Sequence, residues 1–138
     1  MKSESLDLEQ LVRSGWEEVG KKGASAMVAL LAPAYIRHGS ARDYNRDEWI
    51  ALLDERQQAF PDNVTTIDMV VTEGSLLAYR WTAVGTHERV YYGVPKTGKR
   101  ITVHGITIAR FELGLITEEW ASWDKASVFK TLGIHALF

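Results

Sequence analysis

Apolar residues in the first part of the chain recur at three- and four-residue spacing, which is the period of an α-helix with one buried face. This spacing predicts a helix that ends at Gly20 and Gly23. Residues 24–31 are largely apolar and predict a second, shorter and mostly buried helix, limited by Pro33. The apolar face of the first helix is formed by Leu8, Leu11, Val12, Trp16 and Val19.

A third helix is indicated by its capping residues. Asn45 can accept a hydrogen bond from the backbone of the first turn, and Glu48, three residues later, can accept one in return. Pro61 and Asp62 end the segment. One side of this helix is formed by Trp49, Leu52, Leu53, Arg56 and Phe60.

The second half of the chain changes to segments rich in β-branched and aromatic residues, which are typical of β-strands. Glu73-Gly74 and Leu113-Gly114 are predicted to be two-residue hairpin turns. A short amphipathic helix is expected over Lys125–Leu132, before Gly133. The predicted strands are Val64–Thr72, Leu76–Thr86, Arg100–Phe111 and Leu115–Trp123.

The order of these elements predicts the fold class. Helices followed by an antiparallel meander are typical of an α+β fold, and a chain of 138 residues suits a single domain, residues 1–138. Long strands twist, so the sheet is expected to curve around the helices that cover it. We therefore expect a cone-shaped, curved antiparallel sheet covered by about three N-terminal helices, with a short C-terminal helix and an internal cavity.

Strand register predicts which side chains share a face of the sheet. Counting back from the turn at Leu113-Gly114 pairs Thr107 with Trp120 and puts His104 on the face opposite Asp124. The face that includes Asp124 is rich in small residues, and a carboxylate beside unfilled volume is typical of a functional pocket. Its expected members are Val103, Gly105, Thr107, Ala109, Glu118, Trp120, Ser122 and Asp124.

Composition narrows the classes of partner and cofactor. The net charge is −2, so there is no strong positive field to hold nucleic acid. The chain has no cysteine, which excludes thiol catalysis and disulfides and suits a cytoplasmic protein. The longest apolar stretch, Ala24–Tyr35, is too short to span a bilayer, and the polar N-terminus lacks the core of a secretory signal. Neither metal-ligand spacing nor a phosphate-binding glycine loop is present, so no metal or cofactor is expected.

An ordered series of short motifs resembles the SnoaL-like polyketide cyclases, or ester cyclases, of the nuclear-transport-factor-two-like superfamily. The similarity extends from about Tyr35 to Gly133. It implies an α+β cone, a homodimer, and chemistry that needs neither cofactor nor metal. The motifs include Phe60-Pro61-Asp62, Arg80-Trp81-Thr82, Gly85-Thr86-His87, Gly93-Val94-Pro95, Thr97-Gly98-Lys99-Arg100, Glu118-Glu119-Trp120, Asp124 and Leu132-Gly133.

The resemblance also implies an acid/base residue. In the aldol cyclases of this family it is an aspartate on the last strand, and Asp124 matches it by its place after Glu118-Glu119-Trp120. The reaction removes a proton next to a carbonyl and then protonates the new alkoxide, and burial adapts a carboxylate to both steps. His38 would serve as a second base or carbonyl donor, since the family often points a histidine into the cavity. Substrate contacts are expected from Trp120, Arg80, Thr107, Tyr35 and Glu118.

Two positions depart from the aldol cyclases, which carry glutamine and histidine on the penultimate strand. This chain has Thr107 and Ala109 there, and neither can polarise a carbonyl as imidazole does. The related limonene epoxide hydrolases use an Asp-Arg-Asp set, for which the segment Arg100–Phe111 supplies no aspartate. The tyrosine and protonated acid of ketosteroid isomerases have no clear match.

The leading candidates also have purely structural interpretations. In this alternative, Asp124 is only the cap of the helix that follows it, and His38 is a loop histidine that is hydrogen-bonded to the backbone. Arg80 would either clamp a carboxylate or enolate or form a structural salt bridge.

Other residues are expected outside the catalytic centre. Tyr91 and Tyr92 would line the cavity mouth or a dimer contact, and His87 would lie on the solvated surface. The opposite sheet face, which suits a subunit interface, would include His104, Ile106, Ile108 and Trp123.

Three functions remain open on this evidence. The leading hypothesis is a small cofactor-free enzyme with a hydrophobic pocket. It would catalyse cyclisation, isomerisation or a related lyase-type step on an apolar carbonyl-bearing substrate, with Asp124 as general acid/base. The second is a binding protein that holds an apolar small molecule without changing it. The third is a dimeric assembly module whose pocket is filled by side chains.

Overall fold

The elements follow the predicted order, with two short strands added before the third helix. The computed structural model describes residues 7–133. In chain order the elements are α1 (Leu8–Lys22), the 3₁₀ helix η2 (Ala24–Leu30), β1 (Leu31–His38), β2 (Asp43–Asn45), α2 (Arg46–Ala59), β3 (Val64–Glu73), β4 (Leu76–Thr86), β5 (Arg100–Glu112), β6 (Leu115–Trp123) and α3 (Lys125–Leu132).

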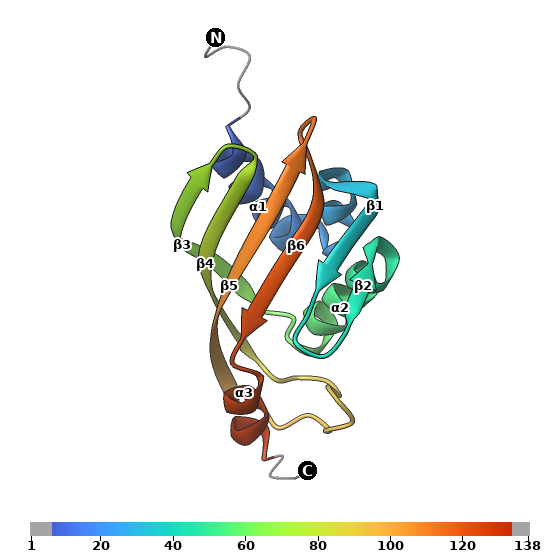
Figure 1. Cartoon of the computed structure of the whole chain (residues 1–138). Helices are drawn as coiled ribbons and strands as arrows, with labels where there is room; N and C mark the ends of the chain where they lie inside the picture. Colours follow the sequence, from blue (N-terminus) through green and yellow to red (C-terminus); the bar gives the residue numbers. More distant parts are fainter. Residues whose placement is uncertain (1–6, 134–138) are drawn as a thin grey trace.

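All six strands form one curved, unclosed sheet in the order β2-β1-β6-β5-β4-β3, with the N-terminal helical segments behind it (Figure 1). The α+β fold and the curved sheet under N-terminal helices are confirmed. We call the helix-covered side of the sheet the inner face and the other side the outer face. None of the helices in residues 7–133 has the length and apolar character that crossing a bilayer requires.

Local signals in the sequence account for the helix ends. Asp7 caps α1 by accepting a hydrogen bond from the backbone N–H of Gln10, and Gly23, with φ of 95°, ends that helix. The predicted capping box of α2 is confirmed, with distances of 2.9 Å in both directions between Asn45 and Glu48. These interactions join residues that are close in sequence, which is why the pattern alone predicts them.

The segment after the first helix differs from the prediction. Residues 24–30 form a 3₁₀ helix, and residues 31–38 form strand β1 instead of ending a helix. β1 pairs with β6 in parallel, so the expectation of a fully antiparallel sheet is wrong at this one pair. Pro33 lies between Leu31 and Ile36, where the pairing with β6 is irregular, because proline has no N–H to donate to a regular ladder.

The β3–β4 hairpin turns one residue later than predicted. Glu73 pairs with Leu76, so Gly74 and Ser75 form the turn, and Gly74 has the positive φ that such a turn requires. A bulge between Ile67 and Met69 then shifts the register. As a result Ile67 lies opposite Trp81 and packs on the core.

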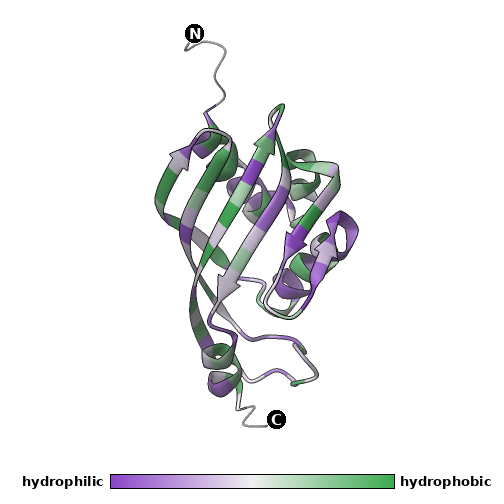
Figure 2. Cartoon of the chain, in the orientation of Figure 1, coloured by the Kyte–Doolittle hydropathy of each residue, from purple (hydrophilic) through white to green (hydrophobic). Residues whose placement is uncertain are grey.

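The core lies on the inner face in two clusters. Hydrophobic and hydrophilic positions alternate along the strands, as Figure 2 shows. One cluster lies under α1, η2 and α2 and includes Val12, Val19, Met27, Leu31, Tyr35, Trp49, Leu53, Leu77, Tyr79, Trp81, Phe111 and Ile116. The other lies under α3 and includes Ala59, Phe60, Tyr91, Ile101, Val128 and Leu132.

Candidate functional site

A single extra residue in β6 decides which side chains face the cavity. The turn at Leu113-Gly114 is confirmed, since Glu112 pairs with Leu115. The register then shifts, and Arg110 pairs with Glu118, so that Thr117 is the additional residue of a bulge. Because side chains alternate along a strand, the shift exchanges the faces of every later residue of β6.

The prediction of which β6 side chains face the pocket is therefore wrong. Thr107 is paired with Ala121 instead of Trp120, and Gly105 is paired with Trp123. The inner face receives Glu119, Ala121 and Trp123, whereas Glu118, Trp120 and Ser122 lie on the outer face.

His38 belongs to a charged cluster on the outer face instead of the cavity. Its ring nitrogens lie 2.9 Å from Asp43 Oδ1 and 2.7 Å from Glu118 Oε2. The ring stacks on Trp120, at 5.4 Å between centroids. Hydrogen bonds with Glu118 and then with Asp43 raise the pKa of His38, so these contacts favour its charged form. The expected placement of His38, Trp120 and Glu118 around the cavity is corrected accordingly.

Asp124 is the cap of α3. It is exposed, and its Oδ1 accepts a hydrogen bond of 2.9 Å from the backbone N–H of Ser127. Asp124 and His104 border the same shallow depression on the outer face, so the prediction that they lie on opposite faces is wrong. The two chain neighbours of Asp124, Trp123 and Lys125, nevertheless line a hollow of the inner side.

Arg80 lies on the outer face and forms a salt bridge. Its Nη1 is 3.2 Å from Asp68 Oδ2, and the same carboxylate oxygen accepts a hydrogen bond of 2.6 Å from Thr82. Of its two sequence-based interpretations, this geometry matches the structural salt bridge.

A buried polar network occupies the inner face. Glu119 Oε1 accepts hydrogen bonds from the Tyr35 hydroxyl at 2.5 Å and from Arg37 Nη1 at 2.9 Å. Glu119 is 3% exposed and Arg37 is 7% exposed, so both charges are almost fully removed from water. Burial opposes the charge of Arg37, but Glu119 raises its pKa overall. The guanidinium lies 3.6 Å from the centre of the Trp49 ring.

Tyr35 and Thr107 do lie inside, as predicted, but each is bonded within the protein. Burial and then the Glu119 carboxylate raise the pKa of Tyr35, which keeps its hydroxyl protonated as a donor. Thr107 Oγ1 accepts a hydrogen bond of 3.1 Å from the indole N–H of Trp81. Both residues therefore belong to the bonded core, and neither is among the residues that line the two hollows described below.

Two hollows open between the lower half of the sheet, α2, α3 and the loop of residues 87–99. Both are narrow, because the space that a water-sized sphere can enter is about 30 Å³ in the first and about 60 Å³ in the second. Both share one wall, formed by Arg56, Tyr91 and Trp123. The first, which we call the apolar hollow, is also lined by Phe60, Asn63, Trp81, Ala83, Gly85, Ile101, Val103 and Val128. The second, the polar hollow, is also lined by Arg37, Tyr44, Trp49, Leu52, Glu55, Tyr92, Lys125 and residues 39–41.

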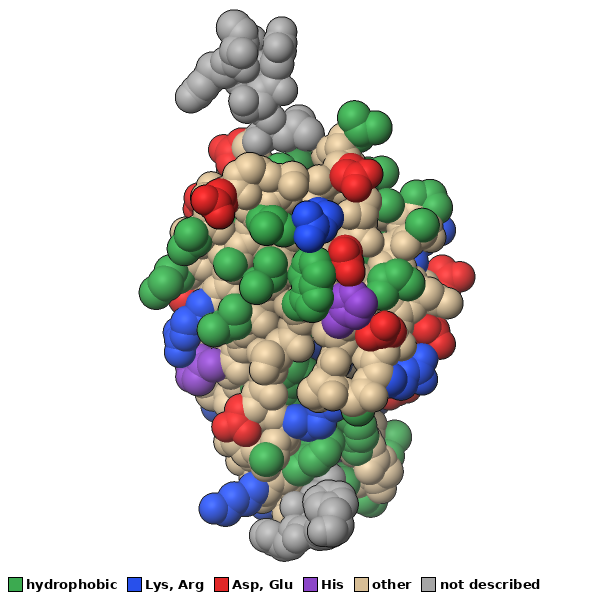
Figure 3. Space-filling model, in the orientation of Figure 1, with side chains coloured by type: hydrophobic (Ala, Val, Ile, Leu, Met, Phe, Trp, Pro, Cys, Tyr) green, Lys and Arg blue, Asp and Glu red, His purple; other side chains and the backbone are tan. Residues whose placement is uncertain are grey.

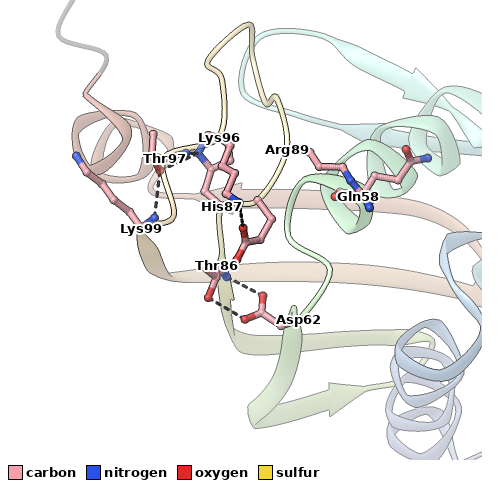
Figure 4. A network of polar contacts seen from close by, with 9 residues as sticks. Gln58, Asp62, Thr86, His87, Arg89, Lys96, Thr97 and Lys99 are labelled. Carbon is pink, nitrogen blue, oxygen red and sulfur yellow. Dashed lines mark hydrogen bonds and ion pairs between the residues drawn. The ribbon is translucent and has the colours of Figure 1, made fainter.

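The loop that carries Tyr91 is closed by His87, as Figure 4 shows. His87 is 0% exposed, so the prediction of a solvated histidine is wrong. Its backbone bonds Lys99 and Gly98 at 2.9 Å each, and its Nδ1 accepts the backbone N–H of Thr97 at 3.3 Å. The other ring nitrogen, Nε2, has no hydrogen-bond partner among residues 7–133. The histidine thus joins both ends of the loop. Tyr91 and Tyr92 on this loop line the polar hollow, which agrees with one of the two roles predicted for them.

Comparisons with known proteins identify the family of this chain. The family model described as SnoaL-like polyketide cyclase matches residues 10–132. The chain belongs to the SnoaL-like polyketide cyclase family. This membership supports the prediction of a small cofactor-independent enzyme of the cyclase or isomerase type that acts on a small molecule. A comparison with curated proteins gave no significant match.

Solved structures show the same fold as this SnoaL-like chain. AclR from Streptomyces galilaeus is 21% identical with a TM-score of 0.86, over 92% of this chain and 96% of AclR. IdmH from Streptomyces antibioticus is 24% identical with a TM-score of 0.81, over 94% of this chain and 100% of IdmH. A nuclear-transport-factor-two-like protein from Burkholderia pseudomallei is 17% identical with a TM-score of 0.75, over 94% and 100%.

The cavity of the SnoaL-like chain contains one candidate functional residue that the sequence analysis predicted only as part of a helix face. Arg56, on α2, reaches between the rings of Trp49 and Trp123, at 5.6 Å and 5.9 Å from their centres. Burial lowers its pKa. An arginine among the apolar residues of an amphipathic helix was the signal that could have identified it. Within residues 7–133 no group of three His, Asp or Glu side chains is arranged to hold a metal ion.

Proposed function

We propose that this SnoaL-like chain transfers protons on an apolar, carbonyl-bearing substrate held in the two joined hollows. The observation that carries the proposal is their shared wall, where a guanidinium and a phenol stand among aromatic and aliphatic side chains. Family membership supports the reaction class, which is cyclisation or isomerisation. Mostly apolar walls with a few polar groups are typical of small-molecule sites.

Each part of the site has a role in this scheme. Removal of a proton next to the carbonyl leaves negative charge on the carbonyl oxygen. The hydroxyl of Tyr91 supplies a donor for that oxygen, and a donor in a water-poor site stabilises developing charge strongly. Trp81 and Trp123 offer flat surfaces for the body of the substrate. Return of the proton then gives the cyclised or isomerised product.

Asp124 is proposed as the acid/base. Its chain neighbours Trp123 and Lys125 line the polar hollow, while its own side chain caps α3 and borders the depression on the outer face. Only Oδ1 is used by the helix cap, and Oδ2 accepts no hydrogen bond from the described residues. The proposal also rests on the match of Asp124 to the aspartate of the aldol cyclases.

The proposed chemistry is testable before the natural substrate is known. We expect the protein to accelerate exchange of α-protons for deuterium in a panel of bicyclic and tricyclic aryl ketones that includes 1-tetralone, followed by NMR in D₂O. Asp124→Asn should lower the catalysed rate by about 100-fold or more, which is the usual contribution of a positioned acid/base. Asparagine also caps helices well, so α3 should remain intact.

Asp7→Asn is the matched control, because Asp7 caps α1 in the same way, through the backbone N–H of Gln10. It should leave the exchange rate unchanged. Equal rates for Asp124→Asn and the unmodified protein would exclude Asp124 as the acid/base. No acceleration for any ketone would count against the proton-transfer function itself.

Binding without turnover is the second candidate function. One observation favours it: no carboxylate is among the described residues that line the apolar hollow. A ligand of this kind should raise the melting temperature and be recovered chemically intact. Recovery of a cyclised, isomerised or deuterated compound would reject this alternative.

We also propose that the outer face forms a homodimer. Hydrophobic side chains gather over the strands on this face, with charged side chains around them (Figure 3). The large exposed ones on the strands include Ile36, Val64, Met69, Val71, Ile106 and Ile108. An exposed apolar patch rimmed by polar residues is typical of a protein–protein interface.

Ile106→Glu should convert the dimer to a monomer, because it puts a charge in the middle of this patch. Sedimentation equilibrium measures the molecular mass directly. Val90→Glu is the matched control, since Val90 is exposed to 63% against 54% for Ile106 but lies in the loop of residues 87–99. A monomeric unmodified protein, or a dimer that persists in Ile106→Glu, would reject the proposed interface.

A further inference from the structure

Arg56 carries a charge that the protein does not neutralise. No carboxylate among residues 7–133 lies within ion-pair distance of its guanidinium. Its neighbours are the rings of Trp49 and Trp123 and the hydroxyl of Tyr91. These contacts orient the group but leave its charge uncompensated.

Arg37, on β1, is an arginine of purely structural role and can be compared with Arg56. Arg37 also lies on a ring of Trp49, at 3.6 Å, but Glu119 compensates its charge through a buried ion pair at 2.9 Å. The proximity of Arg37 further disfavours the charge of Arg56, in addition to the effect of burial. Arg56 keeps partial access to water, but it lies between aromatic rings without a carboxylate partner, which points to a role in binding.

The other charges of the cavity reinforce this imbalance. Glu119 already compensates the charge of Arg37. The other charged residues that line the polar hollow are two cations, Arg56 and Lys125, and one carboxylate, Glu55. Glu55 is exposed, and no ion pair joins it to Arg56. Arg56 also belongs to the wall of the apolar hollow, where it is the charged lining residue.

We propose that the ligand of this cavity carries a carboxylate, which binds Arg56 while the apolar body of the ligand occupies the apolar hollow. The inference rests on the ligand cavity of the proposed function and adds the class of its substrate. The planar guanidinium matches a carboxylate with two parallel hydrogen bonds. One guanidinium, with Lys125 farther out, suits a single negative charge better than the multiple charges of a phosphate.

The inference explains why the two hollows meet at this residue. A ligand with a flat apolar body and a terminal carboxylate would insert its rings between Trp81, Ile101 and Val128. Its carboxylate would then reach Arg56 at the shared wall, and the hydroxyl of Tyr91 would remain the donor for the carbonyl oxygen. The ligand carboxylate would compensate the positive charge of Arg56. The local electrostatics would therefore favour the protein with its ligand bound.

A matched pair of probes tests the inference: anthraquinone-2-carboxylate and its neutral methyl ester, titrated at pH 7.5 with tryptophan fluorescence as the readout. Trp81 and Trp123 line the apolar hollow, so binding should quench their emission. The unmodified protein should bind the carboxylate at least about tenfold more tightly than the ester, as expected for a charge-assisted hydrogen bond. Arg56→Gln should reduce this preference to within about threefold and leave ester binding nearly unchanged.

Arg110→Gln is the control, because Arg110 lies on the outer face beside Glu118, and it should retain the full preference. Equal binding of both probes to the unmodified protein would overturn the inference and leave the cavity intact. A preference that survives Arg56→Gln would overturn the assignment to Arg56. Failure of both probes to bind would reject the cavity of the proposed function and the inference with it.

Thermal stability without ligand supplies a second measurement. If the charge of Arg56 serves a ligand, Arg56→Met should keep or raise the melting temperature, because it removes an uncompensated charge and keeps an apolar stem. Arg56→Lys should retain part of the preference for the carboxylate. A fall of more than about 5 °C in Arg56→Met would show that the charge stabilises the folded protein and would overturn the inference.

Discussion

Glu119→Gln is expected to lower the free energy of unfolding by about 3–5 kcal/mol, the usual effect of removing one partner from a buried ion pair. Glu119 accepts hydrogen bonds from both Tyr35 and Arg37. Without its charge, Arg37 remains a cation that is 7% exposed and has no compensating carboxylate in the network. Urea unfolding, followed by far-UV circular dichroism, measures the change.

Glu118→Gln is the matched control, because Glu118 is the adjacent residue of β6 but lies on the outer face, where its side chain is 34% exposed. Its effect should stay below about 1 kcal/mol, as for other solvent-accessible ion pairs. Adding Arg37→Met to Glu119→Gln should restore much of the lost stability, since neither charge is then buried alone. A loss below about 1 kcal/mol in Glu119→Gln would contradict this account of the network.

Gly105→Ala is the second change with a large expected effect. A Cβ on Gly105 would lie 2.1 Å from Cζ2 and 2.5 Å from Cε2 of Trp81. The indole cannot move aside freely, because it is 5% exposed and its N–H is bonded to Thr107. We expect a loss of about 1–3 kcal/mol in the free energy of unfolding, as for other overpacked cores. Since Trp81 also lines the apolar hollow, ligand binding should weaken as well.

Gly20→Ala is the matched control for the same chemical change. Gly20 lies within α1, and a Cβ there would meet nothing within 4 Å. Alanine is the better helix former, so this variant should gain about 0.5–1 kcal/mol. The two variants should therefore differ in sign in parallel urea titrations. Equal stability of Gly105→Ala and the unmodified protein would show that Trp81 has another low-energy position.

Elements with local signals are predictable from the sequence. Three such features depend on residues that are neighbours in the chain: the capping box of α2, the turn at Leu113-Gly114, and the strands from Val64 onward. Strand β1 carries no such signal. It is a strand because β6, which follows much later in the sequence, supplies its parallel partner. The local pattern therefore predicts a helix over residues 24–31 and no strand at residues 31–38.

The prediction of the site was limited by the register of a single strand. The bulge at Thr117 exchanges the faces of the later residues of β6. It moves Glu119 and Trp123 inward and leaves Trp120 outside. Alternation specifies faces only when the count of residues is known, and nothing local to Thr117 indicates an extra residue.

The sequence by itself determined the α+β class, the family and the limits of most elements, because each depends on periodicity, capping or motifs read along the chain. Only the tertiary structure decided which side chains meet. It brings Arg56 of α2 together with Tyr91 of the loop and Trp123 of β6, and it buries His87 and Glu119. The physical reason is that these contacts depend on strand register and on packing between distant segments, which no local pattern encodes.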